Sequence, residues 1–424
     1  MNCSGKVCVL THGCPENRID GARIREFLKK NGHKLTSEVR DADIILLNAC
    51  GLTRHSEKIN RDLISRIEAL KKPSAKVIMG GCLTKINSDF RQNLTFGVDD
   101  DLALLNTMFD ARIPVQNIHA NFLLPQVRLR DASAKTVETT RSVLRKLTRP
   151  RVIAGKLLRY YRTGCRVSGS RNGERTISKL SRERQESVGT VVNVYKPSTF
   201  LIKVSTGCLN TCSYCAVRLS RGRLKSKPID RVVEEFEEGV AKGYRQFGLI
   251  GTDVGAYGRD RDTDLVTLLK ELLRTDGDYR IKLRNIQPRF LIEMLPELRK
   301  ILQSGKVTYL SSAAESGNNR ILRLMNRGYR IEAFKEAIGL LNMDFPYIQL
   351  RTQLMVGFPS ETEEEFQDTV RLLDELNFDV VEVYIFQSRP GTEAAKMAGQ
   401  IHKKVALRRC YELCMSSERV IPYL

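Results

Sequence analysis

The chain has 424 residues, 42% of them hydrophobic and 28% charged, with a net charge of +21. This composition is typical of soluble globular proteins with two or three domains. There is no apolar run of the ~20 residues that a membrane span requires. The N-terminus also lacks a basic segment followed by an apolar one, as in a secretory signal. We therefore expect a cytoplasmic protein without a membrane partner, in which the eleven cysteines stay reduced.

Three short apolar runs, each followed by a turn and a cysteine, organise the first 120 residues. The runs are Lys6–Leu10, Ile44–Leu47 and Lys76–Met79, and the cysteines that follow them are Cys14, Cys50 and Cys82. Helix-like stretches between the runs predict a parallel sheet, whose strand ends collect ligands at one edge. The three thiols could therefore hold an iron–sulfur cluster. Alternatively they are buried cysteines that pack as small apolar groups.

Residues 121–197 interrupt this pattern with a basic segment. Between Pro125 and Thr190 there are 17 Lys and Arg residues against 5 Asp and Glu residues, and Tyr160 and Tyr161 lie among arginines. Such a segment is suited to phosphate contacts and base stacking, and so favours an RNA partner such as tRNA. Alternatively it is a solvated linker, with the two tyrosines packed on the body of the protein.

A second group of cysteines follows the strand-like run Phe200–Val204. Cys208, Cys212 and Cys215 have the spacing C-x3-C-x2-C, and Tyr214 precedes the last of them. Three thiolates can hold three irons of a [4Fe–4S] cluster and leave the fourth iron open to a small molecule. A structural zinc site is the alternative, but it requires a fourth ligand. No Cys or His lies within about fifteen residues of the trio to supply one.

Strand-like and helix-like segments alternate from residue 198 onward. The predicted strands are Phe200–Val204, Gln246–Ile250, Arg280–Ile286, Lys306–Leu310, Gln349–Val356 and Asp379–Phe386. The predicted helices are Ile229–Lys242, Asp264–Arg274, Phe290–Gln303, Ile331–Asn342 and Glu361–Leu376. Ser360 is predicted to cap the last of these helices, with a capping-box partner.

Several predicted strands end in small or polar residues that suit a ligand bound at the open iron. The candidates are Gly251 and Asp253, then Glu315 and Ser316, and then Gly357. Glycine at a strand end lets the backbone approach a ligand closely, although such turns are also common packing devices.

The motifs together resemble the radical S-adenosylmethionine (SAM) methylthiotransferases. The resemblance rests on THGCPEN, NACGLT, GGCLTK and GCLNTCSYC, with Arg221-Gly222-Arg223 and Ser226-Lys227-Pro228 after them. It covers residues 1–120 and 200–395. It implies an α/β fold, with an N-terminal parallel α/β domain (1–120) and a (β/α)6 partial TIM barrel with a C-terminal helix (198–424). The family usually passes from the first domain to the second more directly, so the basic segment (121–197) is expected to be an insertion peculiar to this chain.

The resemblance also implies the cofactors and their ligands. Cys208, Cys212 and Cys215 would hold the [4Fe–4S] cluster that cleaves SAM, and Cys14, Cys50 and Cys82 an auxiliary [4Fe–4S] cluster for sulfur delivery. The residues expected to bind SAM are Tyr214, Gly251, Asp253, Glu315, Ser316 and Gly357. An electron donor such as flavodoxin or ferredoxin would be a further partner.

The expected reaction is insertion of a methylthio group into an unactivated C–H bond, on a tRNA adenosine near the anticodon. A protein or peptide side chain is the alternative substrate, and a non-catalytic iron–sulfur nucleic-acid-binding protein is the alternative function. Two departures from the family bear on the substrate. Leu310–Gly317 lacks the His, Pro and Gln of the family's His-x-Pro-x-Gln-Ser-Gly motif, and the chain ends at Leu424, where most members continue into an RNA-gripping TRAM domain.

The other cysteines carry less information. Cys410 and Cys414 are one helical turn apart, a spacing that can bind metal but more often packs. Cys3, Cys8 and Cys165 are expected to be structural.

Overall fold

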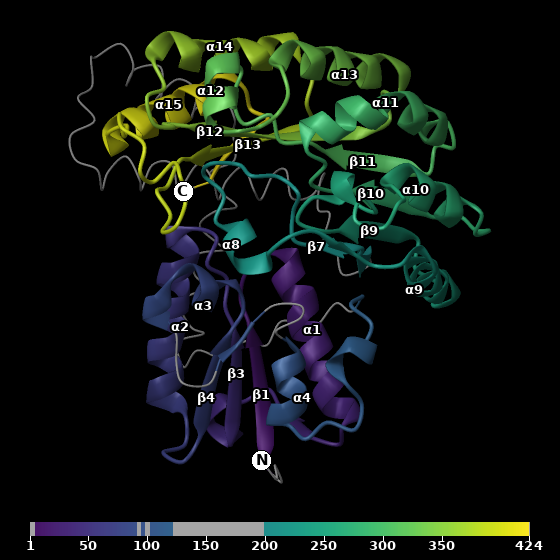
Figure 1. Ribbon diagram of the computed structural model, residues 1–424, viewed down its shortest axis with the longest axis vertical. Coiled ribbons are helices and arrows are strands. Elements are labelled where there is room, and N and C mark those ends of the chain that lie inside the picture. The colour runs from purple at the N-terminus through teal and green to yellow at the C-terminus, as the bar shows by residue number, and fades with distance from the viewer. Residues whose placement is uncertain (1–4, 91–94, 98–101, 122–198, 424) are drawn as a thin grey trace, which may run out of the picture.

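The computed structural model describes residues 5–90, 95–97, 102–121 and 199–423. The basic segment, with Tyr160, Tyr161 and Cys165, lies outside these residues, as does Cys3. The described residues form two α/β units, one above the other in Figure 1. Between them lie helix α8 (Val217–Arg221) and the loop that carries Cys208, Cys212 and Cys215, here called the cluster loop. None of the helices described is long and apolar enough to cross a membrane.

The N-terminal unit is a five-stranded parallel sheet in the order β2-β1-β3-β4-β5. Its strands are β1 Lys6–Thr11, β2 Lys34–Thr36, β3 Ile44–Asn48, β4 Lys76–Gly80 and β5 Thr95–Phe96. Its helices are α1 Pro15–Lys30, α2 Arg54–Leu70, α3 Cys82–Ile86 and α4 Leu104–Met108. The strand order reverses between β1 and β3, and ligands of open α/β sheets bind at such a point.

Alternate residues of β1 belong to two separate cores, one on each face of this sheet. Val7 and Val9 pack with α1 through Phe27, whereas Cys8 and Leu10 pack on the opposite face with α2 through Ile67. Because both faces are covered, β3 is buried along its whole length. Cys8 is thus a core residue, as expected.

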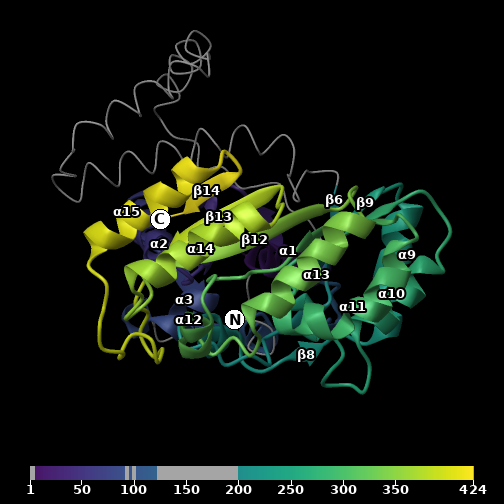
Figure 2. The same ribbon diagram turned by 90° about the horizontal axis from the view of Figure 1, so that it is seen from above.

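The second unit is a seven-stranded parallel sheet, curved into a partial barrel, in the order β14-β13-β12-β11-β10-β9-β6. Its strands are β6 Thr199–Lys203, β9 Gln246–Ile250, β10 Arg280–Leu283, β11 Val307–Ser311, β12 Gln349–Val356, β13 Val380–Ile385 and β14 Val420–Tyr423. Its longer helices are α9 Ile229–Ala241, α10 Leu265–Leu273, α11 Pro288–Leu302, α13 Ile331–Asp344, α14 Glu363–Glu375 and α15 Lys403–Ser416. They cover the outer face of the sheet (Figure 2).

The predicted fold class is confirmed, and two details differ from the prediction. A seventh strand, β14, follows α15 and pairs with β13, where the sequence indicated only a helix. The segment is short and contains Pro422, which a strand tolerates only at the edge of a sheet. β10 ends at Leu283 and not at Ile286, because Asn285 adopts a φ of +56°.

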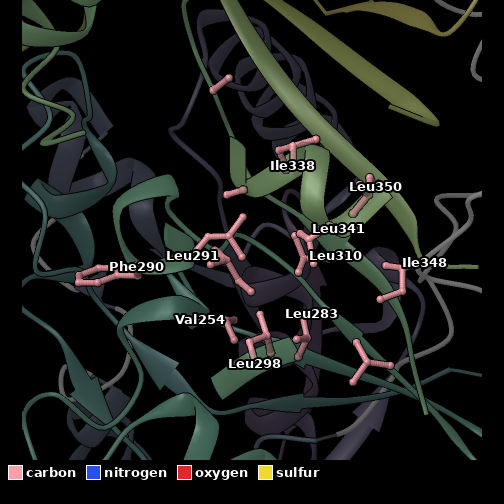
Figure 3. Packing of buried hydrophobic residues seen from close by; sticks show 14 of the residues in the cluster. Val254, Leu283, Phe290, Leu291, Leu298, Leu310, Ile338, Leu341, Ile348 and Leu350 are labelled. Carbon is pink, nitrogen blue, oxygen red and sulfur yellow. The ribbon is translucent and has the colours of Figure 1, made fainter. Parts of the chain in front are cut away.

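The core of the barrel lies between the sheet and these outer helices. Leu283, Leu310 and Leu350 come from adjacent strands and meet α11 and α13 (Figure 3). Cys410 and Cys414 are buried in the same core, from α15.

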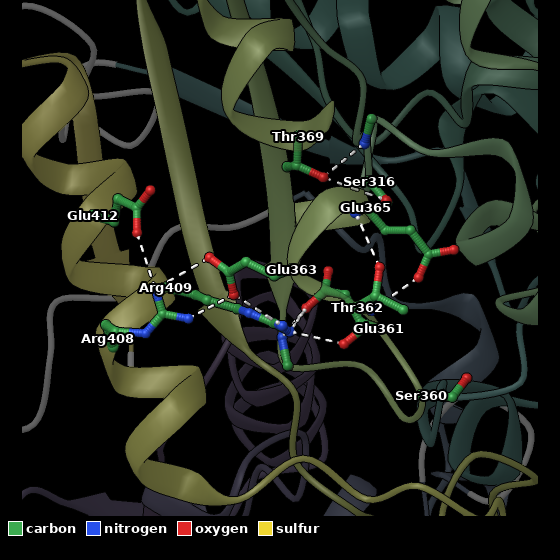
Figure 4. A network of polar contacts seen from close by, with 12 residues as sticks. Ser316, Ser360, Glu361, Thr362, Glu363, Glu365, Thr369, Arg408, Arg409 and Glu412 are labelled. Atoms are coloured by element: carbon green, nitrogen blue, oxygen red, sulfur yellow. Dashed lines mark hydrogen bonds and ion pairs between the residues drawn. The ribbon is translucent and has the colours of Figure 1, made fainter. Parts of the chain in front are cut away.

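The cap of α14 lies two residues beyond its predicted position. Thr362 and Glu365 form the capping box, whereas Ser360 has a φ of +62° and lies in the preceding turn. Both Ser360 and Thr362 have a glutamate three residues later in the sequence, but only Thr362 has the extended backbone of a cap residue and forms both hydrogen bonds of the box. The buried Glu361 carboxylate accepts hydrogen bonds from the Gly357 backbone N–H and from Arg409 of α15, both at 2.7 Å (Figure 4).

Candidate active site

A cavity of about 900 Å³ lies between the two α/β units and is lined by both of them. The cysteines in its lining are Cys14 and Cys50 from the N-terminal unit and Cys208, Cys212 and Cys215 from the barrel. Tyr214, Asp253 and Glu315 also line it. Of the remaining predicted site residues, Cys82, Gly251, Ser316 and Gly357 are described but lie outside the lining. The fold thus brings two cysteine groups, far apart in sequence, to one cavity.

The N-terminal cysteines lie at the carboxyl ends of three neighbouring strands. Cys14 precedes α1, Cys50 follows β3, and Cys82 is the first residue of α3 after β4. Gly13 packs so closely on Cys50 that a Cβ atom at residue 13 would lie 2.3 Å from the Cys50 Cβ. The Cys82 Sγ is 3.6 Å from the Asn17 Oδ1 of α1.

Hydrogen bonding within this group favours one thiolate. The pKa of Cys14 is lowered to about 5, chiefly because its sulfur accepts a hydrogen bond from the Cys50 thiol. Burial opposes this shift, and the positive charge of Arg221 adds to it. Burial raises the pKa of Cys82 to about 11, and the positive charge of Arg221 opposes this increase.

Arg221 of α8 (Val217–Arg221) joins the cluster loop to the N-terminal unit. Its buried guanidinium lies 3.1 Å from Glu16, 3.2 Å from Asp20 and 2.9 Å from the Asn17 side chain, all on α1. The cation therefore compensates buried carboxylates and lies close to the thiols of the N-terminal group.

The cluster loop begins after β6 and is closed at its base by the short antiparallel pair β7 Ser205–Thr206 and β8 Lys225–Ser226. Gly207 has a φ of +71°, and a Cβ there would lie 2.0 Å from the Arg223 carbonyl oxygen. Only glycine fits this position. The Cys208 N–H then donates to the Gly222 carbonyl at 3.2 Å, which fixes the start of the loop.

Two side chains donate hydrogen bonds to the sulfurs of this loop. The Cys208 Sγ accepts from the backbone N–H and the side chain of Asn210, at 3.3 and 3.2 Å. The Cys212 Sγ lies 3.5 Å from a guanidinium nitrogen of Arg327. Donors placed in this way tune the potential of a thiolate-bound cluster.

The donor set of this loop fits an iron–sulfur cluster. Burial raises the pKa of Cys208 to about 12 and that of Cys215 to about 11. A thiol binds a metal as the thiolate, so binding of iron here would release protons. Among the described residues, no three His, Cys, Asp or Glu side chains converge as ligands of a single metal ion. A cubane cluster has no such requirement, because each thiolate binds a different iron.

Polar residues at the strand ends surround the cluster loop. Tyr214 donates to the Glu315 carboxylate at 2.8 Å, and Arg327 lies 4.0 Å from the same carboxylate. Asp253 accepts from the Asn210 side chain at 2.6 Å and from the Gln287 N–H at 3.2 Å, and burial raises its pKa to about 6.

Three predicted site residues instead contact neighbouring protein groups. Gly251 packs on Ser205 and Gly357 packs on Ala406 of α15, so closely that a Cβ atom added to either glycine would lie 2.6 Å from the nearest atom. The Ser316 hydroxyl lies 3.4 Å from that of Thr369 and is fully buried. A role of these three in binding SAM stays a prediction.

Several charged residues on the barrel side of the cavity were not predicted from the sequence: Arg284, Arg327, Arg351, Arg389 and Glu382. Arg351 could have been predicted from the sequence. It alternates with Gln353 and Met355 along β12, and all three line the cavity. Every second residue of a strand faces the same side, and here that side is the cavity.

Comparisons with known proteins agree with this architecture. Residues 202–373 match the radical SAM superfamily, and residues 6–99 match the uncharacterized protein family UPF0004. The structure of TsrM from Kitasatospora setae, a radical SAM methyltransferase, is similar to this one, with a TM-score of 0.56 at 15% sequence identity. The similarity extends over 92% of this chain and 75% of the TsrM chain. The protein is therefore a radical SAM enzyme.

Two relatives identify the branch within that class. A probable threonylcarbamoyladenosine tRNA methylthiotransferase of Pyrococcus horikoshii is 30% identical over 92% of this chain and 79% of its own length. A tRNA-2-methylthio-N(6)-dimethylallyladenosine synthase of Thermoanaerobacter sp. is 27% identical over 95% of this chain and 76% of its own length. The chain belongs to the radical SAM methylthiotransferase family and, as such an enzyme, uses a [4Fe–4S] cluster and SAM.

Proposed function

We propose that this enzyme transfers a methylthio group to an adenosine of tRNA, near the anticodon. The observation that carries the proposal is the single cavity lined by Cys14 and Cys50 on one side and by Cys208, Cys212 and Cys215 on the other. The printed names of the Pyrococcus and Thermoanaerobacter relatives, which specify modified adenosines of tRNA, support the choice of substrate.

The proposed ligands of the SAM-cleaving cluster are Cys208, Cys212 and Cys215, and those of an auxiliary [4Fe–4S] cluster are Cys14, Cys50 and Cys82. When bound, the first cluster supplies the electron that cleaves SAM, and the second supplies the sulfur. The chain's own residues hold and tune these groups. Asn210 and Arg327 donate to sulfurs of the barrel loop, and Arg221 favours the thiolate form of Cys14.

The proposed SAM site lies beside the barrel loop. Tyr214, Asp253 and Glu315 line the cavity there, and two buried carboxylates at this position can accept hydrogen bonds from the ammonium and ribose groups of SAM. Gly251, Ser316 and Gly357 would support this site from the ends of β9, β11 and β12.

Two partners and a compartment complete the proposal. The basic segment at 121–197, outside the described residues, would contact the tRNA phosphates. An electron donor such as flavodoxin or ferredoxin would reduce the clusters. We expect the enzyme to meet the tRNA and the electron donor in the cytoplasm, where its thiols stay reduced.

Two variants test the proposed division of labour between the cysteine groups. After anaerobic reconstitution, Cys212→Ala should produce no 5′-deoxyadenosine from SAM. Cys50→Ala should still produce it but should form no methylthiolated nucleoside in tRNA, measured by mass spectrometry of the digest. Cys414→Ala changes a core cysteine that does not line the cavity. It is the control, and it should both produce 5′-deoxyadenosine and form the methylthiolated nucleoside.

Two outcomes would refute this assignment. Substantial 5′-deoxyadenosine from Cys212→Ala would remove the barrel loop from SAM cleavage. Normal thiomethylated product from Cys50→Ala would remove the N-terminal group from the reaction. If wild-type enzyme cleaves SAM but leaves tRNA unmodified, a protein or peptide side chain becomes the preferred substrate.

A further inference from the structure

The side chain of Asn210 connects two groups on the barrel side of the cavity. Its Nδ2 donates to the Cys208 Sγ at 3.2 Å and to the Asp253 carboxylate at 2.6 Å. An amide nitrogen carries two hydrogens, so both of them are used. One small side chain therefore lies between a proposed ligand of the cluster and a carboxylate of the proposed SAM site.

These two contacts fix the orientation of the Asn210 amide. If the amide were turned over, its oxygen would face the Asp253 carboxylate and the Cys208 sulfur, both of which accept hydrogen bonds here. The Asn210 Oδ1 therefore points away from both groups. This oxygen is buried and has no hydrogen-bond partner among the residues that the structure describes.

Gln287 provides a second oxygen of the same kind. Its Nε2 donates to the Arg327 carbonyl at 3.2 Å, and a turned-over amide would place two oxygens against each other. Its Oε1 is buried and likewise has no partner within the described part of the chain. The residues Asn210 and Gln287 are 8% and 6% exposed, and both line the cavity.

Asp253 holds the two residues in place. One of its oxygens accepts from the Asn210 side chain, and the other accepts from the Gln287 N–H at 3.2 Å and from the Gly255 N–H at 3.1 Å. These donors are neutral, so the carboxylate keeps its negative charge. Because buried polar atoms of native proteins are nearly always paired, the two free amide oxygens beside a carboxylate indicate a cationic ligand with N–H groups.

We infer that the side-chain oxygens of Asn210 and Gln287 accept hydrogen bonds from the ammonium group of SAM, and that Asn210 couples SAM binding to the cluster. This inference rests on the proposed function and makes Asn210 a positioning residue. Its hydrogen bond to the Cys208 sulfur stabilises the more negative, reduced cluster and so raises the reduction potential. Gln287, whose hydrogen bonds go to Asp253 and Arg327, acts on SAM alone.

Variants of the two residues separate these effects in the anaerobically reconstituted full chain. Asn210→Ala should raise the dissociation constant of SAM by about 10-fold and lower the midpoint potential of the cluster measured without SAM. Gln287→Met, which nearly keeps the volume of the side chain, should raise the dissociation constant to a similar extent and leave that potential unchanged.

Electron paramagnetic resonance of the reduced protein, frozen before SAM is cleaved, measures both quantities. The signal that changes when SAM is added belongs to the cluster with an open iron. Its dependence on SAM concentration gives the dissociation constant, and its dependence on the applied potential gives the midpoint potential. Iron content and circular dichroism check that each variant holds its clusters and is folded.

Thr211→Ala is the matched control, because Thr211 lies between Asn210 and Cys212 on the same loop. Thr211 is exposed, is not among the residues that line the cavity, and accepts a hydrogen bond from the Asn326 side chain at 2.7 Å. This variant should bind SAM as wild type does and have the wild-type potential. Changes equal to those of Asn210→Ala would assign the effects to the loop as a whole and overturn the inference.

Three other results would overturn the inference: wild-type affinity for SAM in either Asn210→Ala or Gln287→Met, a wild-type potential in Asn210→Ala, or an Asn210→Ala protein that assembles no cluster. The last result would mean that Asn210 is needed to build the loop. Each of them leaves the proposed function standing if the wild type methylthiolates tRNA. If the wild type binds no SAM at its cluster, the proposed function fails, and the inference fails with it.

Discussion

Arg221 lies between the two cysteine groups, where its charge acts on both the fold and the thiols. It is 1% exposed and pairs with Glu16 and Asp20. Asp20 has a second cation in Lys203, at 2.7 Å, whereas Glu16 depends on Arg221: burial raises the pKa of Glu16 to about 7, and Arg221 is the largest opposing influence. Loss of Arg221 therefore leaves a buried carboxylate without its main counter-charge.

We expect Arg221→Met to lower the free energy of unfolding by about 3–5 kcal/mol, as when one partner of a buried ion pair is removed. Urea unfolding monitored by circular dichroism measures the change. Arg223→Met, at an exposed position of the same motif, is the control and should change little. A loss below about 1 kcal/mol for Arg221→Met would show that the pair is not compensating a buried charge.

At the residue scale, the cysteines could be found from sequence because their spacing and their position after apolar runs are local patterns. Arg327 and Arg389 could not, because the groups that they contact lie far away in the chain. Arg327, for example, reaches Cys212 across 115 positions. Only the folded barrel determines that contact.

At the scale of elements, apolar runs predicted each long strand of both sheets, because a parallel strand is buried on both faces. The ends of the elements were harder to predict. Asn285 ends β10 through a positive φ, and Thr362 rather than Ser360 caps α14. Both outcomes depend on local hydrogen bonds that a hydrophobic pattern does not contain.

The turn before α14 should make stability depend on pH. Burial raises the pKa of Glu361 to about 7 from an ordinary value of 4.5, against opposing effects of the Gly357 N–H and Arg409. Between these two pH values the unfolded chain holds fewer protons at this carboxyl than the folded chain. The contribution of Glu361 to stability therefore falls as pH rises through this window.

We expect the free energy of unfolding of the wild type to fall between pH 5 and pH 7.5 by about 2 kcal/mol more than that of Glu361→Gln. Urea unfolding at both pH values measures the difference. Glu364→Gln, at an exposed position of the same helix, should behave as wild type. The same pH dependence in Glu361→Gln and wild type would contradict the role assigned to this carboxyl.

At the scale of the whole molecule, the active site depends on how the two units pack together. Arg221 and Lys203 reach α1, and Arg389 of the barrel donates to the Gly51 carbonyl and to Glu57, both at 2.7 Å. The sequence predicted the two units and the two cysteine groups but contained no pattern for their contact. Such a contact is made by side chains that are far apart in the chain.

Binding of tRNA should depend steeply on salt if the basic segment contacts phosphates. We expect the dissociation constant to rise strongly between 50 and 200 mM salt, and the log–log slope to decrease by about 2 to 3 when Arg145, Lys146 and Arg149 are replaced by Gln. Filter binding at several salt concentrations measures the slope. Replacing the exposed Lys29, Lys30 and Lys58 of the N-terminal unit is the matched control. An equal change of slope in both variants would contradict a specific role for the segment.

The central claim is a radical enzyme with two clusters that open into one cavity. Its most direct test is the iron and acid-labile sulfide content of the anaerobically reconstituted full chain, followed by measurement of 5′-deoxyadenosine after SAM and a reductant are added. We expect about eight irons per chain together with SAM cleavage. About four irons with cleavage would remove the auxiliary cluster, and a cluster-replete protein that leaves SAM intact would contradict the claim.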